Sequence, residues 1–394
     1  MINSIDEFLS RLKNFEKTRN KNHFQNYTLN KFRETLNIFL ENQGNKQKKT
    51  RISVVGTNGK GSVSFYLQNI ALRSEYLLPI GLYTSPHLEH FTERININGK
   101  HIPIKWILDF LNSIEEEKLR LLEELSYFEF LTLLAMVYFD ENKCNLEIYE
   151  AGLGGKLDAT KESNPDFVVL TKVGYDHTEI LGKKLETILN EKLLISTNNT
   201  KAIFSMDQDF SLYEIIEKFT EETNITLYKF SHKKLNYLDY NYFFANYILE
   251  KVSNIRGENK SFILEKNPPP LKGRMEVWKK DPITIFDVGH NPDAIYYLLN
   301  SMENSYGIEK WNIVVTTLKD KDIKGILDIL VNWSHTNNVY RIHSDYFNDE
   351  VYENSKVIDI QVEEIHKVSL NSPTLICGGF RIYGILKKYF GNQS

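Results

Sequence analysis

The sequence has few cysteines and no long apolar run, and both absences narrow the class of protein. Only two cysteines, Cys144 and Cys377, occur among 394 residues, which excludes a disulfide scaffold or a cysteine-rich zinc site and favours a reducing cytoplasm. The longest apolar stretch, residues 130–139, has about half of the ~20 residues that a membrane-spanning helix needs. The first residues lack the basic start and apolar run of a signal peptide. We therefore expect a soluble, cytoplasmic, globular protein.

An excess of positive charge is also lacking. The 48 basic and 52 acidic side chains give a net charge of −4, which argues against a basic nucleic-acid-binding surface. The hydrophobic share of 41% is enough to build packed cores, so wholesale disorder is excluded. The charge balance does not exclude a local anion site, because backbone N–H groups can bind phosphate without any net charge.

Short apolar strands alternate with helices along most of the chain after the first fifty residues, which look helical and polar. We expect strands over 52–55, 79–84, 146–150, 167–171, 201–204, 225–230, 283–287, 311–316, 339–343 and 374–378. Helices are expected over 107–125, 126–139, 293–304 and 322–331, and from about Phe380. This alternation predicts mostly parallel sheets with helices on both faces.

The best linker is the proline run at 268–270, since prolines cannot continue a helix or a central strand. We therefore predict an α/β protein of two domains. The first, over 1–270, is a large P-loop domain with a mostly parallel sheet. The second, over 271–394, is a smaller, Rossmann-like α/β domain.

A glycine-rich turn separates the first expected strand from a helix, and it reads Gly56-Thr57-Asn58-Gly59-Lys60-Gly61-Ser62. Glycines let the backbone wrap a phosphate, and the helix N-terminus directs its N–H groups and positive dipole at it. Lys60 would reach the terminal phosphates, and Ser62 would lie near Mg²⁺. The match to a standard P-loop is imperfect, because position 54 is valine and Gly61 separates the lysine from the serine. A plain βα turn is the alternative, but the lysine and serine after a strand favour phosphate binding.

Polar residues also follow several other expected strands. They are Ser85 and His87 on either side of Pro86, Glu150, Asp176-His177, Asp287 and His290. The carboxyl edge of an open α/β sheet is where ligands bind, and carboxylates, an imidazole and a hydroxyl beside a phosphate loop suit a divalent cation. Each residue alone has an ordinary role in turns or caps, so their joint occurrence is what favours a site.

The combination of motifs resembles the folylpolyglutamate synthase/dihydrofolate synthase family, a branch of the Mur ligases. The segments that carry the resemblance are GTNGKGS (56–62), GLYTSPHL (81–88), ERI (93–95), FE (128–129), EAGLGGKLDAT (150–160), DH (176–177), EK (191–192), GR (273–274), DVGHNP (287–292) and LKDKDI (318–323). The resemblance implies an ATP-dependent amide ligase in which ATP phosphorylates a pterin carboxylate and the amino group of L-glutamate attacks the acyl phosphate. The acceptor implied is dihydropteroate, a reduced folate or both, and we favour an enzyme with both activities by analogy with prokaryotic members of the family.

The resemblance also implies roles for individual residues. Residues implied in catalysis are Lys60, His177, Lys192, Asp287 and His290. Residues implied in ATP binding, besides 56–62, are Arg274 and Asp287. Residues implied as ligands of two Mg²⁺ ions are Ser62, Ser85, Glu150, His177 and Lys192, the last once it is carbamylated. Residues implied in pterin binding are Ser85, Pro86, His87, Arg94, Glu129 and Asp158. K⁺ is a further cofactor that the resemblance suggests.

Some of these residues have structural alternatives. Lys192 would be an exposed helix lysine, and Asp158 would form a turn. In the LKDKDI segment, Asp320 or Asp322 would cap a helix. Lys156 and Lys161 stand where the family often has arginine and asparagine, which bears on substrate preference more than on ATP chemistry.

Two alternatives exist for the protein as a whole. A Mur-type cell-wall ligase usually carries a further domain before the P-loop, whereas here the loop begins at Gly56. A catalytically inactive nucleotide-binding module would be favoured by the loss of Lys60, Glu150, His177 or Lys192, but all four are present. We expect a monomer that acts on small molecules and has no nucleic-acid or membrane partner.

Overall fold

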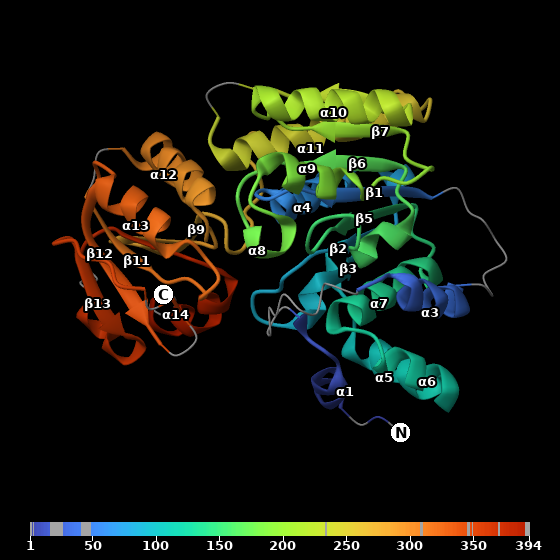
Figure 1. The fold of residues 1–394 in the computed structure, drawn as a ribbon, viewed down its shortest axis with the longest axis horizontal. Coiled ribbons are helices and arrows are strands. Elements are labelled where there is room, and N and C mark those ends of the chain that lie inside the picture. Colours follow the sequence, from blue (N-terminus) through green and yellow to red (C-terminus); the bar gives the residue numbers. More distant parts are fainter. Residues whose placement is uncertain are drawn as a thin grey trace. The chain divides into compact units, whose positions relative to one another are not determined.

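The computed structural model of the chain contains two units, each built around its own β-sheet (Figure 1). It describes residues 2, 4–15, 27–40, 49–232, 235–307, 310–344, 347–348, 350–368 and 371–390. The first unit comprises Met1–Val173, Thr178–Ser231 and Tyr242–Leu264. The second comprises Gly174–His177, His232–Asn241 and Glu265–Ser394. The long stretch of the second unit thus begins close to the proline run.

The first unit holds an eight-stranded sheet in the order β4-β3-β2-β5-β1-β6-β7-β8. Its strands are β1 (Thr50–Val55), β2 (Ile80–Tyr83), β3 (Ile95–Ile97), β4 (Lys100–His101), β5 (Leu146–Glu150), β6 (Phe167–Leu170), β7 (Ala202–Ser205) and β8 (Thr226–Lys229). The neighbouring strands in the run β2-β5-β1-β6-β7-β8 pair in parallel, as predicted. The antiparallel β3 and β4 are not predicted by the alternation of strands and helices.

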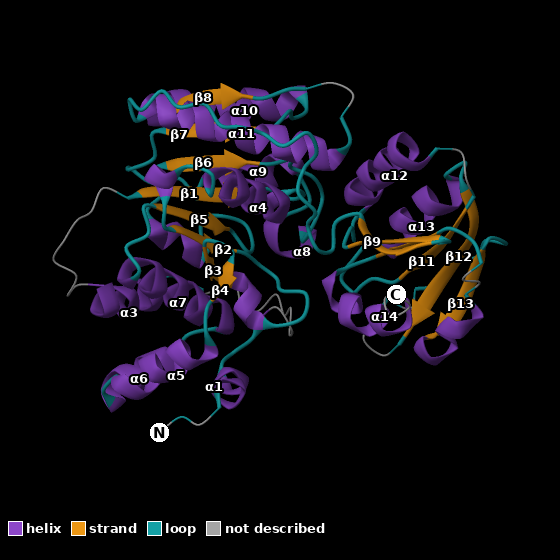
Figure 2. Cartoon of the chain, turned by 180° about the vertical axis from the view of Figure 1, so that it is seen from behind, coloured by secondary structure: helices purple, strands orange, loops and turns teal. Residues whose placement is uncertain are grey.

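The first unit also contains helices, several of which pack on this sheet (Figure 2). They are α1 (Ile5–Arg11), α3 (Asn30–Leu40), α4 (Lys60–Ala71), α5 (Ile104–Ser113), α6 (Glu116–Glu123), α7 (Tyr127–Glu141), α8 (Thr178–Leu181), α9 (Leu185–Leu193), α10 (Phe210–Thr223) and α11 (Tyr237–Ile255). Short 3-10 helices lie at Glu75–Leu77, Phe91–Arg94 and Ala159–Ser163. The helix α4 packs on β1, β2 and β5, and α7 packs on β2 and β3.

The prediction of one helix over 107–125 is wrong, because the structure has two helices there. Ile114 and Glu115 are extended, with ψ of 151° and 150°. The Ser113 hydroxyl donates to the Phe110 carbonyl and so satisfies one of the last carbonyls of α5. Acidic residues at the start of α6 favour a new N-terminus there, since they interact well with the positive end of the helix dipole.

The predicted buried helix after Ser126 is confirmed as α7, which begins with a capping box. The Ser126 hydroxyl accepts from the Glu129 N–H, and the Glu129 carboxylate accepts from the Ser126 N–H. The side chains of Phe130, Leu133 and Phe139 are fully buried. Phe139 lies so close to β2 that a Cβ at Gly81 would be 2.6 Å from its ring. These α7 side chains therefore form part of the hydrophobic core of the first unit.

The second unit holds a six-stranded sheet in the order β13-β12-β11-β14-β10-β9. Its strands are β9 (Glu276–Lys280), β10 (Ile283–Asp287), β11 (Trp311–Val315), β12 (Thr336–His343), β13 (Val357–Gln361) and β14 (Thr374–Cys377). Its helices are α12 (Pro292–Tyr306), α13 (Ile323–Asn332) and α14 (Tyr383–Phe390), with 3-10 helices at Val362–Lys367 and Phe380–Ile382. All strands are parallel except β9. This confirms a mostly parallel, Rossmann-like second sheet, although β9 and β13 are not predicted.

Both cysteines are buried in these cores as free thiols. Cys144 lies just before β5, and burial, followed by the nearby Glu147 charge, raises its pKa to about 12. Cys377 ends β14, and burial raises its pKa as well. Both thiols are therefore protonated at neutral pH.

Within the residues that the structure describes, no helix is both long enough and apolar enough to cross a membrane.

Candidate functional site

Three neighbouring strands of the first sheet bring their following loops to one edge. The strand β5 lies between β1 and β2, with Val54 opposite Glu150 and Tyr83 opposite Tyr149. The glycine-rich turn after β1, Ser85 after β2 and Glu150 at the end of β5 therefore share the carboxyl edge. The Glu150 Oε2 accepts the Ser85 N–H at 3.1 Å, and a Cβ at Gly61 would lie 3.3 Å from the same oxygen. The buried Glu150 carboxylate thus touches both loops.

The glycine-rich turn leads into α4, and part of its backbone is held by the protein itself. The N–H groups of Thr57 and Asn58 donate to the Lys172 carbonyl at 2.9 and 3.2 Å. Only glycine fits at position 56, because a Cβ there would lie 1.9 Å from the Thr171 hydroxyl. The protein therefore already uses the N–H groups of Thr57 and Asn58, and the prediction that residues 57–62 bind phosphate depends mainly on the N–H groups at the start of α4.

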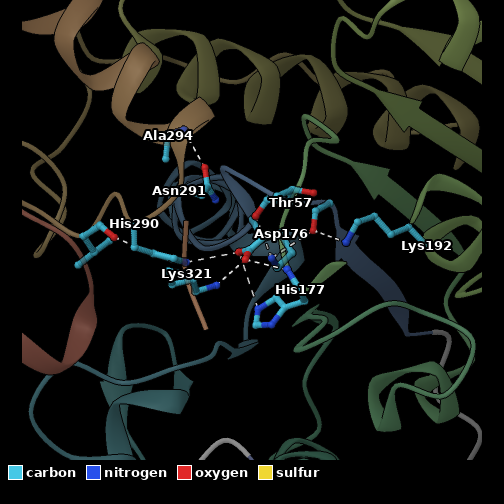
Figure 3. Close-up of polar contacts among 11 residues, drawn as sticks. Thr57, Asp176, His177, Lys192, His290, Asn291, Ala294 and Lys321 are labelled. Atoms are coloured by element: carbon cyan, nitrogen blue, oxygen red, sulfur yellow. Dashed lines mark hydrogen bonds and ion pairs between the residues drawn. The ribbon is translucent and has the colours of Figure 1, made fainter. Parts of the chain in front are cut away.

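Two lysine side chains point at the carbonyl of Gly56. The Lys60 Nζ donates to the carbonyls of Gly56 and Thr57, both at 3.2 Å. The Lys192 Nζ donates to the Gly56 carbonyl at 2.8 Å (Figure 3). Lys192 is only 4% exposed, so the alternative of an exposed helix lysine is wrong. A lysine is almost never fully buried unless its charge is compensated, which marks Lys192 as a candidate site residue.

The loop after β2 carries Ser85, Pro86 and His87 and is ordered by its own hydrogen bonds. The Arg94 Nε donates to the His87 Nδ1 at 3.0 Å, and the guanidinium lies 5.3 Å from the centre of the Tyr127 ring. Arg94 is buried. The two predicted substrate residues, His87 and Arg94, therefore contact each other through this hydrogen bond.

Glu93 closes the same loop. Its carboxylate accepts the N–H groups of Leu88, Glu89 and His90 at 2.9, 3.0 and 2.7 Å. Burial would raise the pKa of Glu93, but these hydrogen bonds and the His87 charge lower it below its ordinary value.

The predicted substrate carboxylates Glu129 and Asp158 both have structural partners. Glu129 accepts the Tyr27 hydroxyl at 2.7 Å in addition to its capping bond. Asp158 accepts four hydrogen bonds within its own turn, from the N–H groups of Gly152 and Leu153 and from the N–H and hydroxyl of Thr160. Burial raises the pKa of Asp158, although these bonds oppose the shift. The structure therefore shows the turn-forming role of Asp158 directly.

In the second unit, Asp287 ties together two turns at the end of β10. Its carboxylate accepts the N–H of Gly289 at 2.7 Å, the N–H of Met275 at 3.0 Å and the Tyr237 hydroxyl. The neighbouring Arg274 donates to the Gly273 carbonyl at 3.3 Å. The Arg274 guanidinium also lies 5.2 Å from the centre of the Phe380 ring. Arg274 and Asp287, both predicted to bind ATP, are thus brought to neighbouring positions.

Asp176 lies at the centre of a cationic cluster in the second unit (Figure 3). Its carboxylate pairs with the Lys321 ammonium, lies 3.5 Å from the His290 Nε2 and 3.8 Å from the His177 Nε2, and accepts the His177 N–H at 2.9 Å. Burial would raise the pKa of Asp176, but the His290 hydrogen bond and the charges of His177, Lys321 and His290 lower it well below its ordinary value. The cluster therefore holds an ionised carboxylate beside two predicted site histidines.

Sequence reasoning did not assign Lys321, although it is 7% exposed and sits in the LKDKDI segment. The structural alternative offered for that segment is confirmed for Asp322, which caps α13 by accepting the Gly325 N–H at 2.9 Å. Asn291 likewise caps α12, with Pro292 in the first turn. A lysine between two acidic residues is the only signal that the sequence offers for Lys321, and it does not reveal the partner.

The residues at the edge of the first sheet fit a hard divalent cation bound together with phosphate. In the part of the chain that the structure describes, no three His, Cys, Asp or Glu side chains form a group that would hold a metal ion. The predicted ligands Ser62, Ser85 and Glu150 instead offer two hydroxyls and one carboxylate at one edge. Mg²⁺ is usually held by one or two carboxylates together with substrate phosphates and waters, so this oxygen set suits Mg²⁺ with a nucleotide.

Comparisons with known proteins agree with this geometry. The profile of the Mur ligase middle domain matches residues 54–263. The dihydrofolate synthase/folylpolyglutamate synthase of Buchnera aphidicola subsp. Acyrthosiphon pisum is 35% identical over 311 residues, which cover 74% of each chain. The fold is similar to that of Escherichia coli FolC in complex with DHPP and ADP, with a TM-score of 0.76, 22% identity, and coverage of 98% of this chain and 97% of that one.

A further similar structure contains a nucleotide analogue together with a metal ion. The bifunctional folylpolyglutamate synthase/dihydrofolate synthase of Yersinia pestis, complexed with AMPPNP and Mn ion, has a TM-score of 0.73 and 25% identity. The match covers 93% of this chain and 95% of that one. The sequence matches, the fold and the oxygen ligands of the loops thus all indicate a ligase that uses a nucleotide and a divalent metal ion.

Proposed function

This chain belongs to the dihydrofolate synthase/folylpolyglutamate synthase family of the Mur ligases, and from that premise we propose its substrates and the roles of its residues. It is an ATP-dependent ligase that joins glutamate to a folate-type substrate and uses a nucleotide and a divalent metal ion. The finer proposal is that one enzyme carries out two reactions. In the first it adds L-glutamate to dihydropteroate, and in the second it extends reduced folates.

The reaction needs phosphate chemistry because a carboxylate is a poor electrophile. Transfer of the γ-phosphoryl group of ATP to the pterin carboxylate gives an acyl phosphate and ADP. The glutamate amine then attacks the acyl carbon, and the tetrahedral intermediate collapses to the amide and phosphate as the amine loses its proton. The site must stabilise the developing charge and exclude water, which would hydrolyse the acyl phosphate.

The observation that carries this proposal is the meeting of the Lys60 loop, Ser85 and Glu150 at one edge of the first sheet. We propose that Lys60 exchanges its two carbonyl partners for nucleotide phosphate, since a charge-assisted bond to phosphate is stronger than one to a neutral carbonyl. Ser62, Ser85 and Glu150 would hold Mg²⁺, which when bound neutralises phosphate charge. A second Mg²⁺ with His177 as a ligand, a requirement for K⁺, and a monomeric state stay predictions.

We also propose that Lys192 is carbamylated in the working enzyme. Its ammonium is buried and directed at the Gly56 carbonyl, beside the loop that would bind Mg²⁺ and phosphate. A cation there is unfavourable beside a metal ion, whereas addition of CO₂ to the amine, with loss of a proton, creates a carboxylate. Labelled bicarbonate should give a carbamate carbon signal in the ¹³C NMR spectrum of the wild type and none in Lys192→Met. An unmodified amine in the nucleotide-bound wild type would rule the carbamate out.

The function is tested by phosphate release from ATP with glutamate, with dihydropteroate or tetrahydrofolate as the acceptor. Release with both acceptors supports the bifunctional enzyme, and release with only one restricts the proposal to that reaction. Lys60→Ala should abolish release with both acceptors while the protein stays folded. Glu150→Gln should lower the rate at limiting Mg²⁺ by about 10-fold or more, as is typical of a change at a metal site. Release with neither acceptor would refute the ligase assignment.

A further inference from the structure

A single side-chain amide holds the backbone segment on which the nucleotide loop rests. Gln208 lies in the turn between β7 and α10 and is 6% exposed. Its Oε1 accepts the Val173 N–H at 3.1 Å, and its Nε2 donates to the Thr171 carbonyl at 2.9 Å. Because one partner is a donor and the other an acceptor, only one orientation of the amide satisfies both. Gln208 therefore clamps this segment at two points.

Lys172, the residue between those two points, makes the contacts to the nucleotide loop. Its carbonyl accepts the N–H groups of Thr57 and Asn58, at 2.9 and 3.2 Å. The Lys172 carbonyl and the Val173 N–H belong to the same peptide group, which is planar. Holding the Val173 N–H therefore also sets the direction in which the Lys172 carbonyl points.

The second contact of Gln208 fixes the peptide group on the other side of Lys172, since the Thr171 carbonyl belongs to that plane. Only φ and ψ of Lys172 connect the two planes, so fixing both planes fixes the conformation of this residue. The sheet supports the segment as far as Thr171, whose N–H donates to the Val55 carbonyl at 2.8 Å. Gln208 extends that support by two residues beyond the sheet.

The neighbouring ion pair is a weaker support for the same segment. The Lys172 ammonium lies 3.0 Å from the Asp209 carboxylate, and the Asp209 side chain is 64% exposed. An ion pair with one strongly exposed partner contributes little, because water and salt screen it. From this side of the segment, the two hydrogen bonds of the buried Gln208 are therefore a stronger support for the orientation of the Lys172 carbonyl than the ion pair.

We propose that Gln208 is a positioning residue for the nucleotide loop. Through the two peptide groups around Lys172, it orients the carbonyl that holds Thr57 and Asn58. It thereby sets where the N–H groups at the start of α4 meet a nucleotide phosphate. This inference rests on the proposed function, which assigns the loop 56–62 to the phosphates of ATP. Gln208 acts through the backbone and does not itself contact the nucleotide.

The test compares Gln208→Met with Gln68→Met in the full-length protein. Methionine has similar length and removes both hydrogen bonds of Gln208. Gln68 is a matched control, since it is also buried and its Nε2 donates to the Ile80 carbonyl and the Asn96 Oδ1, at 3.2 and 2.7 Å. Both variants should lose thermal stability, which unfolding without nucleotide measures. Only Gln208→Met should weaken the binding of Mg·ADP, measured by calorimetry.

We expect the Kd of Mg·ADP to rise about 10-fold in Gln208→Met, the size expected when a loop loses the hydrogen bonds that orient it. The KM for ATP should rise in parallel, while kcat and the KM for the pterin stay within about 2-fold. If Gln208→Met does not fold, Gln208→Glu gives the same test, since its carboxylate keeps the Val173 contact and loses the donor to Thr171.

Equal Mg·ADP affinity in the wild type and the Gln208 variant would overturn the proposal. An equal loss of affinity in both methionine variants would also overturn it, because the effect would then follow from stability alone. Failure of the wild type to bind Mg·ADP would refute the nucleotide assignment and this inference together. Binding of Mg·ADP without glutamate ligation would refute only the proposed function, because the affinity of the Gln208 variant would still decide the role of Gln208.

Discussion

Replacing Lys321 with methionine should destabilise the second unit by about 3 kcal/mol. Lys321 is 7% exposed, and its ammonium pairs with the Asp176 carboxylate, whose side chain is 12% exposed. Removing one member of a buried ion pair costs about 3–5 kcal/mol, because the other charge stays buried without its partner. We take the lower end of this range because Asp176 keeps the His290 Nε2 at 3.5 Å and the His177 N–H at 2.9 Å.

Thermal unfolding measures this effect, with Lys319→Met as the control. Lys319 is exposed in the same loop, so Lys319→Met removes a lysine but leaves the ion pair of the buried Asp176 carboxylate intact. A loss of about 3 kcal/mol should lower the unfolding midpoint of Lys321→Met by about 6–12 °C, and the control should change it by less than about 2 °C. If the unfolding midpoint of Lys321→Met lies within about 2 °C of the wild-type midpoint, as expected for the control, the reasoning is refuted.

A double variant separates the ion pair from general damage to the loop. If Lys321 and Asp176 stabilise the unit through each other, Asp176→Asn combined with Lys321→Met should cost less than the sum of the two single changes. Strictly additive losses would mean that the two side chains contribute independently, and the ion pair would then have no measurable coupling.

Three further changes test contacts in the first unit. Glu93→Gln should cost about 1 kcal/mol after allowance for solvent screening. In the wild type, the pKa of Glu93 is lower in the folded than in the unfolded protein. Its contribution to the free energy of unfolding is therefore fully present above the unfolded pKa of about 4.3 and is lost as the pH falls through the folded pKa. Urea unfolding at several pH values would show this loss. Tyr27→Phe removes the hydrogen bond to Glu129, so it should lower the free energy of unfolding by about 1 kcal/mol. It should also raise the KM for the pterin but not the KM for ATP. Steady-state kinetics in which both KM values stay unchanged would count against Glu129 as a substrate residue. Gly81→Ala should cost about 1–3 kcal/mol in urea unfolding, because its methyl group would overlap the Phe139 ring, and an unchanged midpoint would contradict that packing.

Much of the fold follows from local sequence, because most strands are apolar runs bounded by polar turns. The alternation of strands and helices does not predict the β3–β4 hairpin, although the sequence carries a signal for it. Asn98 and Gly99, with φ of 52° and 77°, are the pair typical of a two-residue hairpin turn. The strands β9 and β13 are harder to predict, since they lie at the edges of the sheet and carry exposed and polar residues.

The candidate site was predictable to the extent that parallel topology determines it. Loops after adjacent parallel strands meet at one edge, so the neighbourhood of Ser85 and Glu150 follows from the order of elements. The burial of Lys192 had a local signal too, because Ile188 and Leu189 precede it by four and three residues on the buried face of α9. The partner of Lys321 is 145 residues away in the sequence, and no local pattern predicts so distant a contact.

The state of the two thiols makes the chain well suited to site-specific labelling. Only a thiolate reacts readily with alkylating reagents, and both Cys144 and Cys377 are buried with raised pKa values. The native protein should therefore stay unlabelled by a maleimide probe without removal of either cysteine. One new cysteine at an exposed position in each unit would then carry a spin or fluorescent probe. The distances between such probes, with and without nucleotide, would show whether nucleotide changes the separation of the two units.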